Sequence, residues 1–593
     1  MKKFCLLLLL LLSLGLNTLA QKITYHLKIE NPYRNCFDIQ IEYLCNEEKY
    51  LDFILPAWRP GSLAITDWSK NVFRVTVQTE KGEKLIVKKI DKQTWRVDCK
   101  PGDKVVFSYK VYSYTMGDPY DAHVESDYAF YNGPQVFMFL DKKQSFPIEV
   151  EFEYPKDWQF HTALTKKISE NKYEASDYDE LIDCPSFFGK LNKFSFEVSG
   201  IPHYIVLNAG YDYNQNQITT DLSKLVAWFK SLFGELPYDN YTFFLRVDES
   251  GRGAIEHRNS NISCIKPNGL LGNLEDPEYY KFFIMTESHE FFHLYNVKRI
   301  RPTEYANTDF RKEYYSDLLW FVEGFTDYYT DRPLSNAGII SSSKVLNRYI
   351  DYNYNPVFNN AFISEKSLAE FSFDAWLRDS AIPDNTHRVC YYKGGLVARI
   401  LDIDMRLKTN HTKTLDGFFR LLYDDIYKKG NTFNSAQLLN LLNNYSGFNY
   451  STFFDKYIYG TDPVPFQEYL NKIGLELKAD KEQAFLGVKL SNEIKSESNV
   501  LFVYPDSPAD KLGIGRGDII LTINGIAVNH ENWESLLKDI DKGSEIELTW
   551  SHNKNIRTGR IRIEEKRAGS FSIARMEDIS KDQEEFIKKW MDP

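Results

Sequence analysis

The chain has 593 residues, enough for three or four domains, and 43% of them are hydrophobic, as expected of folded domains. The formal net charge is −11 and no long basic run occurs, so the composition argues against a nucleic-acid-binding protein. The cysteines are too scattered for a zinc knuckle or a disulfide scaffold, although Cys36 and Cys45 are candidates for a bridge between neighbouring strands.

The first 20 residues have the pattern of a secretory signal peptide. Lys2 and Lys3 precede the apolar run Leu6–Leu12, and Ala20 stands at a cleavage position. The apolar run is too short to favour a membrane span. We therefore expect an exported protein, periplasmic or extracellular, with no stable membrane span after the signal is removed.

Residues 21–202 have the pattern of a β-rich, sandwich-like domain. Apolar and polar residues alternate in runs such as Ile23–Ile29 and Val72–Val77, and Gly, Pro, Asn and Asp separate these runs. The segment Trp58–Ser62 is interpreted as a packed turn.

The segment His289–His293 is a His-Glu-x-x-His motif. On a helix, residues four apart share a face, so His289 and His293 can direct two imidazoles at one metal ion while Glu290 reaches a water molecule beside it. The motif lies in the apolar stretch Tyr280–Val297, which contains no Gly or Pro and favours a buried helix. The alternative is a pair of core histidines satisfied by hydrogen bonds.

A third ligand is expected, because catalytic zinc usually takes three protein ligands. The apolar, helical pattern at Trp320–Tyr329 offers Glu323. Asp327 lies four residues further, on the same helical face, where it can accept the second ring N–H of a ligand histidine. The alternative is an ordinary helix with solvated acids, and its apolar surroundings argue against that.

Residues 203–478 begin with strand-like patterns and then become mainly helical. Tyr391–Val397 opens a helical pattern that continues to Leu401. Leu415–Tyr427 and Ser435–Asn444 also have helical spacing but no obvious ligands, so we interpret them as scaffold.

Residues 482–565 look like a PDZ domain in the segments Phe485–Val488, Val503–Ile514 and Gly517–Gly525. Such domains bind a peptide as an added strand and hold its carboxylate with loop N–H groups. Leu486, Gly487 and Val488 would line that groove. Its ligand would be the C-terminus of a substrate or partner, or none if the groove is occluded. The charged segment 566–593 is interpreted as an appended helix or a loose tail.

The chain resembles the gluzincin metallopeptidases, and within them the glycyl aminopeptidase family that carries a C-terminal PDZ domain. The resemblance rests on His289–Pro302 and Trp320–Tyr329, and the gap of 29 residues between His293 and Glu323 fits this family. It implies a multidomain α+β fold with an N-terminal β-rich domain, a thermolysin-like, mainly helical catalytic domain at 203–478, and the PDZ domain. Trp58–Ser62 also resembles the family's N-terminal domain, without an assigned chemistry.

The resemblance also implies how substrate is held. Gly251–His257 follows the strand-like run Tyr241–Val247 and is similar to the edge-strand motif with which aminopeptidase gluzincins hold a peptide, here through Gly253 and Ala254. Glu256 would bind the free ammonium of the substrate. His257 stands where better-known relatives have Asn, which leaves its role open. The alternative is a hairpin with an exposed acid.

Tyr391 occupies the position from which similar peptidases donate a hydrogen bond to the tetrahedral oxyanion, with Tyr392 as the alternative. The implied mechanism uses one zinc ion per chain, held by His289, His293 and Glu323, to activate water, with Glu290 as the general base.

We therefore expect an exported zinc metallo-aminopeptidase that removes small N-terminal residues, Gly and also Ala, from peptides with a free N-terminus. One alternative is a zinc endopeptidase or oligopeptidase, which would cut N-acetylated peptides as well as free ones. The other is a non-catalytic PDZ-type peptide-binding protein.

Overall fold

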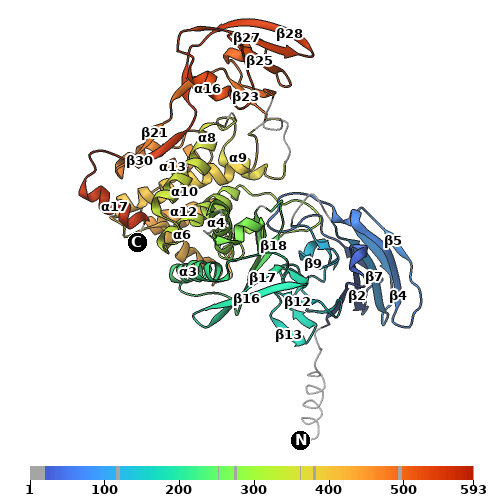
Figure 1. Cartoon of the computed structure of the whole chain (residues 1–593). Helices are drawn as coiled ribbons and strands as arrows, with labels where there is room; N and C mark the ends of the chain where they lie inside the picture. Colours follow the sequence, from blue (N-terminus) through green and yellow to red (C-terminus); the bar gives the residue numbers. More distant parts are fainter. Residues whose placement is uncertain are drawn as a thin grey trace. The chain divides into compact units, whose positions relative to one another are not determined.

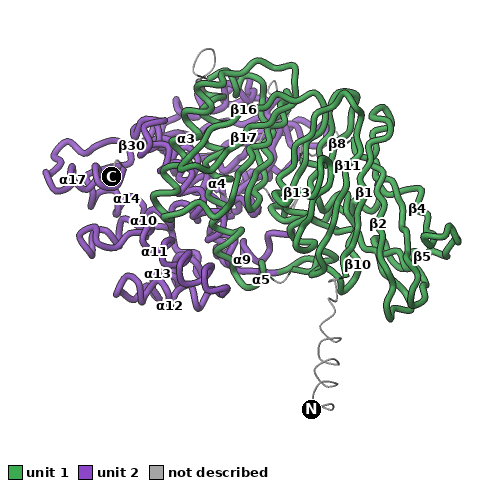
Figure 2. Tube along the Cα trace, turned by 90° about the horizontal axis from the view of Figure 1, so that it is seen from below, with its two compact units in different colours: residues 1–314 green, residues 315–593 purple. Residues whose placement is uncertain are grey.

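The computed structural model describes residues 21–114, 120–251, 253–272, 277–306, 308–360, 362–377, 382, 384–491 and 497–591. The predicted signal peptide at residues 1–20 lies outside this range. The chain divides into two compact units, residues 1–314 and 315–593 (Figure 2). Within the described residues, no helix combines the length and the apolar character that a membrane span requires.

The first unit begins with a β-rich region. Its strands are β1 (Ile23–Lys28), β2 (Cys36–Leu44), β3 (Tyr50–Ile54), β4 (Val72–Thr79), β5 (Val87–Lys89), β6 (Thr94–Asp98), β7 (Lys104–Tyr112), β8 (His123–Val124), β9 (Tyr128–Tyr131), β10 (Phe139–Leu140), β11 (Ile148–Glu153), β12 (Gln159–Thr162), β13 (Lys166–Ser169), β14 (Lys172–Ala175) and β15 (Ser186–Gly189). They form a seven-stranded sheet, β13-β14-β11-β1-β2-β7-β4, and two four-stranded sheets, β10-β3-β6-β5 and β12-β15-β9-β8 (Figure 1).

The core of this region follows from the alternation seen in the sequence. Ile23, Tyr25 and Leu27 of β1 are buried, because alternate side chains of a strand point to the same face. Between the sheets, the rings of Phe53 and Phe107 stack with centroids 4.0 Å apart. The predicted β-rich N-terminal domain is confirmed.

Cys36 and Cys45 do not form the bridge considered from the sequence, and both thiols are free and buried. Cys36 begins β2 and Cys45 follows its last residue, so the two lie at opposite ends of one strand. At about 3.3 Å per residue, the strand separates them by roughly 30 Å. A disulfide requires Cα atoms within about 7 Å.

A five-stranded sheet follows in the first unit. Its strands are β16 (Leu191–Val198), β17 (Ile201–Asn208), β18 (Tyr241–Val247), β19 (Ala254–Glu256) and β20 (Ser260–Ile265), in the order β16-β17-β18-β20-β19. β17, β18 and β20 are parallel, whereas β19 pairs antiparallel with β20 at the edge of the sheet. The predicted strand at Tyr241–Val247 is β18.

Two long helices complete this sheet layer, α3 (Gln215–Phe233) and α4 (Pro277–His293). Phe291 of α4 lies against Phe229 of α3 and against Tyr241 of β18. These aromatic contacts fix the helix that carries the His-Glu-x-x-His motif.

Helix α4 ends earlier than the apolar pattern predicts. That pattern continues to Val297, but the helix ends at His293 and turns follow. The Arg299 guanidinium donates to the carbonyl oxygen of Leu294 at 2.9 Å. Because this side chain satisfies a backbone acceptor beyond the helix end, the turn replaces a further helical turn.

The second unit is mainly helical, as predicted. Its elements before the C-terminal module are η6 (Trp320–Gly324), α6 (Phe325–Asn336), α7 (Ser342–Arg348), η7 (Tyr349–Tyr354), α8 (Asn355–Phe358), α9 (Leu368–Phe373), α10 (Arg388–Thr409), α11 (Leu415–Leu422), η8 (Tyr423–Tyr427), α12 (Ser435–Ser446), α13 (Ser451–Tyr457) and α14 (Phe466–Lys472). The helical pattern that starts at Tyr391 lies within α10. The two scaffold patterns correspond to α11 with η8 and to α12.

The C-terminal module has its own core. Its elements are β22 (Glu482–Ala484), β23 (Val488–Leu490), β24 (Val500–Val503), α15 (Pro508–Lys511), β25 (Ile519–Ile523), β26 (Ile526–Ala527), α16 (Trp533–Lys538), β27 (Glu545–His552) and β28 (Asn555–Arg562). Ile520, Leu548 and Trp550 are among its buried core residues. A separate core is what an independent domain requires.

The chain returns from this module to the helices through a two-stranded ribbon. β21 (Leu475–Ala479) pairs with β30 (Phe571–Arg575), and β22 pairs with β29 (Lys566–Ala568). Helix α17 (Lys581–Met591) then adds Phe586 and Trp590 to the helical core, and Trp590 Nε1 donates to the Tyr328 hydroxyl at 3.3 Å. Of the two interpretations of residues 566–593, an appended helix or a loose tail, the structure shows a packed helix only at Lys581–Met591 and the strands β29 and β30 before it.

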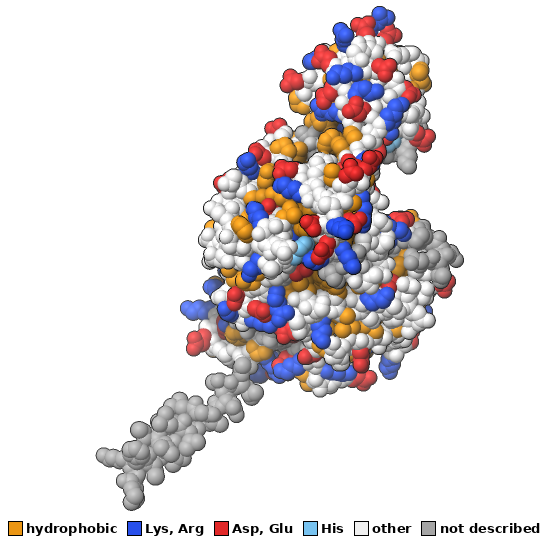
Figure 3. Space-filling view, turned by 90° about the vertical axis from the view of Figure 1, so that its left-hand side faces the viewer, with side chains coloured by type: hydrophobic (Ala, Val, Ile, Leu, Met, Phe, Trp, Pro, Cys, Tyr) orange, Lys and Arg blue, Asp and Glu red, His pale blue; other side chains and the backbone are white. Residues whose placement is uncertain are grey.

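Charged side chains of both signs are mixed over the face drawn in Figure 3. Many are arranged in pairs on single helices, such as Arg420 with Asp424 and Lys472 with Glu468. Exposed pairs of this kind contribute only about 0.3–0.5 kcal/mol each, so they favour solubility more than stability.

Candidate active site

Helix α4 directs two imidazoles toward each other. The Nε2 atoms of His289 and His293 are 3.0 Å apart. On the other side of its ring, His293 Nδ1 lies 2.8 Å from the carbonyl oxygen of Asn296, to which it donates. A proton on Nδ1 leaves the Nε2 lone pair available to a metal ion. Two Nε2 atoms this close can share one cation, or one proton when no cation is bound.

The same helix carries two buried carboxylates beside the histidines. Glu290 is 6% exposed. Glu287 is fully buried, and its Oε2 accepts a hydrogen bond of 2.7 Å from Asn261 of β20, which ties α4 to the sheet. Burial raises the pKa of Glu287 to about 7, although the hydrogen bonds from Ser263 and Asn261 oppose this shift.

Glu323 lies in a π-helical turn, η6, which continues into α6. Two glycines bring this turn close to α10: a Cβ on Gly324 would lie 2.5 Å from backbone atoms of Gly394. This approach places Tyr391 of α10 in a side-chain hydrogen bond with Glu323. Burial and the charge of Glu323 raise the pKa of Tyr391 well above its ordinary value, so the phenol keeps its proton.

Two further predicted residues lie on these helices. Asp327 is buried in the first turn of α6, at 1% exposure. Tyr392, the alternative to Tyr391, instead packs edge-on against Tyr352 at 5.3 Å between ring centroids. Tyr391 is therefore the tyrosine that the structure places beside Glu323.

The available ligand atoms of His289, His293 and Glu323 all lie within 4.8 Å of one another, which singles these residues out among those that the structure describes. Two imidazoles and one carboxylate are the donor set of many catalytic zinc sites, and the set leaves a position for water. The residues present therefore fit a zinc ion.

Strand β19 forms the edge at which a peptide can be held. Ala254, Ile255 and Glu256 pair with β20 on one side, and none of the described strands pairs with the other side. Glu256 is 7% exposed, and its carboxylate makes no hydrogen bond with any other residue that the structure describes. A buried carboxylate is costly unless a cation or a hydrogen-bond donor faces it, so this position suits a cation.

A buried aspartate fixes the ring of His257. Its Nδ1 lies 3.1 Å from Asp183 Oδ1, and the same carboxylate accepts from Lys298 at 2.6 Å and from the backbone N–H of Arg258 at 2.9 Å. Burial alone would raise the pKa of Asp183, but Lys298 and His257 lower it more, and the net pKa is well below its ordinary value. His257 thus joins β19 to the segment after α2 (Tyr178–Ile182).

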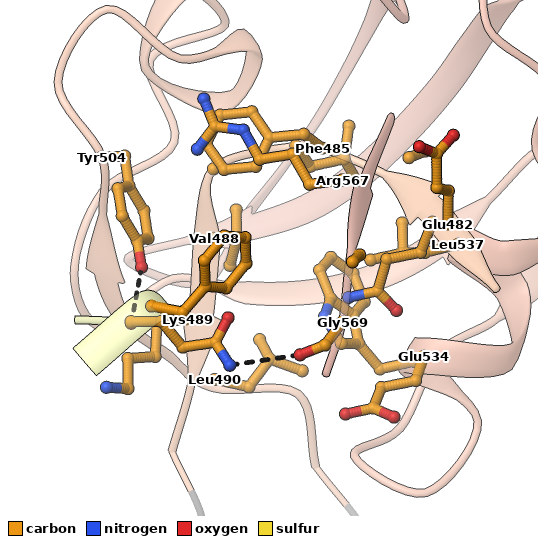
Figure 4. Close-up of a pocket in the computed structure, with 18 of the residues that line it drawn as sticks. Glu482, Phe485, Val488, Lys489, Leu490, Tyr504, Glu534, Leu537, Arg567 and Gly569 are labelled. Atoms are coloured by element: carbon orange, nitrogen blue, oxygen red, sulfur yellow. Dashed lines mark hydrogen bonds between the residues drawn. The ribbon is translucent and has the colours of Figure 1, made fainter. Parts of the chain in front are cut away.

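The C-terminal module contains a groove of about 1170 Å³ (Figure 4). Leu486, Gly487 and Val488 line this groove, and Trp533, Glu534 and Leu537 line it from α16. Its rim also includes Phe358 at the end of α8, Asn359 and Asn360 after it, and Arg567–Gly569 and Phe571 of the return ribbon.

Hydrogen bonds close this outer rim of the groove. The Tyr504 hydroxyl donates to the carbonyl oxygen of Asn359 at 3.3 Å, and the Asn359 amide donates to the carbonyl oxygen of Gly569 at 3.1 Å. The Arg567 guanidinium lies 3.6 Å above the centre of the Phe485 ring.

Comparison with known proteins agrees with this geometry. Residues 24–190 match the Peptidase M61 N-terminal domain, residues 282–397 match the M61 glycyl aminopeptidase family, and residues 500–550 match a PDZ domain. Models of the M61 peptidases thus match both the N-terminal and the catalytic region of the chain. These matches identify it as a zinc-dependent metallopeptidase of the aminopeptidase type.

Solved structures support the fold of this M61 aminopeptidase. An aminopeptidase N family protein from Idiomarina loihiensis is 25% identical, with a TM-score of 0.87 over 96% of this chain and 100% of that one. A mutant M1 zinc metallopeptidase from Deinococcus radiodurans, bound to a Tyr-Ser-Ala substrate, is 12% identical, with a TM-score of 0.50 over 75% and 95% of the two chains. No curated protein matches the sequence.

Sequence reasoning on this M61 aminopeptidase missed the residues that hold the motifs in place. Asp183 and Lys298 fix His257, and Asn261 fixes Glu287, yet none of these pairings has a local signal in the sequence. Of these residues, only Lys298 lies inside His289–Pro302, one of the two segments on which the family resemblance rests. The missed residues are found by burial and hydrogen bonding in the folded chain.

Proposed function

We propose that this M61 aminopeptidase is exported and releases small N-terminal residues, Gly and also Ala, from peptides by zinc-dependent hydrolysis. The observation that carries the proposal is the grouping of His289, His293 and Glu323 within 4.8 Å, on a chain that matches the M61 family. The signal-like pattern of the first 20 residues supports export.

His289, His293 and Glu323 would hold the zinc ion. When bound, zinc supplies a Lewis acid that activates water and polarises the scissile carbonyl. Glu290 follows His289 directly on α4, and its carboxylate is the general base that takes a proton from the attacking water and passes it to the leaving amine. No covalent intermediate with the protein is required.

Tyr391 stabilises charge in the transition state. Its phenol lies beside Glu323 and remains protonated, so it can donate a hydrogen bond to the developing oxyanion. The donor is held by α10 before reaction, and no reorganisation is needed when charge develops.

Glu256 favours exopeptidase over endopeptidase action. Its buried carboxylate, without a hydrogen-bond partner among the described residues, suits a substrate ammonium. An N-acetylated peptide has no ammonium to offer. The substrate seen with the Deinococcus radiodurans enzyme, Tyr-Ser-Ala, is a peptide as well, which supports peptides as the substrate class.

The test is hydrolysis of Gly, Ala and Leu amides and of their N-acetyl forms, with and without a chelator. We expect cleavage of free Gly and Ala amides, little cleavage of the acetylated forms, and loss of activity on chelation with recovery on adding zinc. Equal cleavage of acetylated substrates would show an endopeptidase. Absence of cleavage by zinc-loaded protein would favour the non-catalytic peptide-binding alternative.

We also propose that the PDZ groove binds a peptide C-terminus. Strand β23 and the segment Phe485–Gly487 border the groove, where an added strand and a carboxylate are recognised in such domains. Apolar side chains of Val488, Leu490 and Leu537 line it, which favours a peptide that ends in an apolar residue (Figure 4). The test compares binding of an acetylated decapeptide ending in Val with binding of its C-terminal amide.

A further inference from the structure

The segment Arg59–Ser62 is a defined turn. Ser62 N–H donates to the carbonyl oxygen of Arg59 at 3.1 Å, which closes a four-residue turn. Pro60 occupies the second position and Gly61 the third, with φ of +79°. Proline at the second position and a positive φ at the third define a type II turn, which requires glycine at Gly61.

Buried polar contacts hold this turn from within the β-rich region. Arg59 is 3% exposed, and its Nη1 donates to Asp121 Oδ1 at 2.9 Å. The indole N–H of Trp68 donates to the same oxygen at 3.2 Å. The guanidinium also lies within 5.8 Å of the ring centres of Trp68 and Tyr120. A buried, doubly held ion pair keeps the turn in one position.

The tip of the turn lies against the candidate ammonium anchor. A Cβ on Gly61 would lie 2.7 Å from Glu256 Oε2 and 3.0 Å from Cγ2 of Ile255. At the other end of β19, a Cβ on Gly253 would lie 2.4 Å from the Tyr120 hydroxyl oxygen. The β-rich region therefore contacts both ends of β19. Its Gly61 meets Glu256 at one end, and its Tyr120 meets Gly253 at the other.

We propose that the Arg59–Ser62 turn forms one wall of the pocket for the first substrate residue and that Gly61 limits this pocket to small side chains. An ammonium on Glu256 lies about 2.8 Å from a carboxylate oxygen, and the substrate Cα is about 1.5 Å further. The first substrate residue and the Gly61 backbone are then neighbours. This inference rests on the proposed function and gives Trp58–Ser62 the role that the sequence left open.

The turn positions Glu256 and shapes the pocket without taking part in the chemistry. Adding a methyl group at Gly61 should displace the Glu256 carboxylate or fill the pocket beside it. Both effects weaken substrate binding more than turnover, because zinc, Glu290 and Tyr391 are left in place. The loss should be larger for Ala substrates than for Gly substrates, since the Ala methyl needs the same space.

The experiment compares Gly61→Ala with Gly82→Ala. Gly82 has φ of +84° and no atom within 4 Å of an added Cβ, so it shares the backbone strain of Gly61 but not the contact with Glu256. We expect Gly61→Ala to raise KM for Gly p-nitroanilide about tenfold or more, with kcat and zinc content little changed. Gly82→Ala should stay within about twofold of the parent.

A second substitution, Glu256→Asp, tests whether the effect of Gly61→Ala comes from contact with the Glu256 carboxylate. Glu256→Asp withdraws the carboxylate by one methylene and leaves room for the added methyl, so Gly61→Ala should cost much less in the Glu256→Asp background than in the parent. Additive effects of the two substitutions would overturn the proposal, as would equal KM values for Gly61→Ala and Gly82→Ala.

Failure of the inference can be separated from failure of the proposed function. If the parent enzyme cleaves no free-amine substrate, the proposed function fails, and calorimetric binding of glycinamide to the zinc-loaded proteins decides the inference. Weaker binding to Gly61→Ala than to Gly82→Ala supports the turn as a pocket wall. Equal binding contradicts it.

Discussion

We propose a peptide site both in the catalytic region and in the PDZ groove, but the two are built from different parts. Around α4 and β19 the important groups are buried charged side chains, such as Glu290 at 6% exposure and Asp183 at 9%. In the PDZ groove they are a strand, β23, and apolar side chains such as Val488, Leu490 and Leu537. Hydrolysis needs charges fixed in advance, whereas strand addition needs only a free backbone edge.

This difference predicts different sensitivities. A single change among the buried charges should affect metal content, turnover or folding by large factors, because a charge left without its partner in the interior is costly. A single change in the groove should affect peptide binding alone. The following predictions test this contrast.

Glu323→Ala should give the largest effect. Removing one of three ligands should release zinc on dialysis and abolish hydrolysis, as metal analysis and an amide assay would show. Tyr391→Phe is the matched control, because it removes a neighbour of Glu323 but no ligand and should keep zinc. Stoichiometric zinc in Glu323→Ala would place the third ligand elsewhere.

Glu290→Gln should keep zinc and lose about 10³-fold in kcat, because the amide cannot accept the proton of the attacking water. Glu278→Gln, an exposed position in the first turn of the same helix, should be close to the parent. Steady-state kinetics on Gly p-nitroanilide measures both. Normal turnover in Glu290→Gln would remove the general-base assignment.

Glu256→Ala should lower kcat/KM for free-amine substrates by about 10–100-fold, the value of one charge-assisted hydrogen bond. The slow cleavage of acetylated substrates should hardly change. Glu249→Ala, an exposed acid in the segment before β19, serves as the control. Equal losses on free and acetylated substrates would exclude Glu256 as the ammonium anchor.

Asp183→Asn should lower the free energy of unfolding by about 3–5 kcal/mol at pH 7, because Lys298 would lose its buried counterion. The folded-state pKa of Asp183 is depressed, so its contribution is present above the unfolded pKa of about 3.9 and is lost as the pH falls below it. The stability gap between parent and variant should therefore narrow below about pH 4. Denaturant unfolding at pH 7 and pH 3 measures this gap.

The matched control is Asp239→Asn, an exposed aspartate that borders the same small pocket as Asp183. It should change unfolding little at either pH. A gap for Asp183→Asn that does not depend on pH would contradict the role of the Asp183 charge.

Val488→Glu should have the smallest effect on catalysis. A charge on the groove-lining strand should weaken binding of the acetylated decapeptide ending in Val by about tenfold and leave kcat/KM for Gly p-nitroanilide unchanged. Ile526→Glu, at an exposed position on β26, is the control. Fluorescence anisotropy measures the binding, and a fall in turnover of Val488→Glu would show that the groove and the catalytic region are linked.

The sequence predicts the parts of this molecule whose signal is local. The spacing of His289 and His293 requires only one helical turn, and the alternation in Ile23–Ile29 requires only a strand. The family resemblance and the fold class are confirmed by the comparisons. The roles of individual site residues remain predictions, which the experiments above address.

The rest depends on contacts between distant segments. Gly61 meets Glu256, and Asp183 meets both His257 and Lys298, only after the sheets have formed. The Arg299 side chain donates to the Leu294 carbonyl just beyond the end of α4, and the π-helical turn at Glu323 accompanies the close approach of two glycines. Hydrophobic periodicity contains no information on such polar and steric pairings.

Because the chain returns through β29, β30 and α17, the PDZ domain is attached to the helical unit at both of its ends. It is inserted into the helical unit, anchored at both ends by one ribbon, and cannot drift on a single linker. A truncation that stops after β28 would also remove Trp590 and Met591 from the helical core. Excision of the domain therefore calls for joining its two stems, β21 and β30, directly.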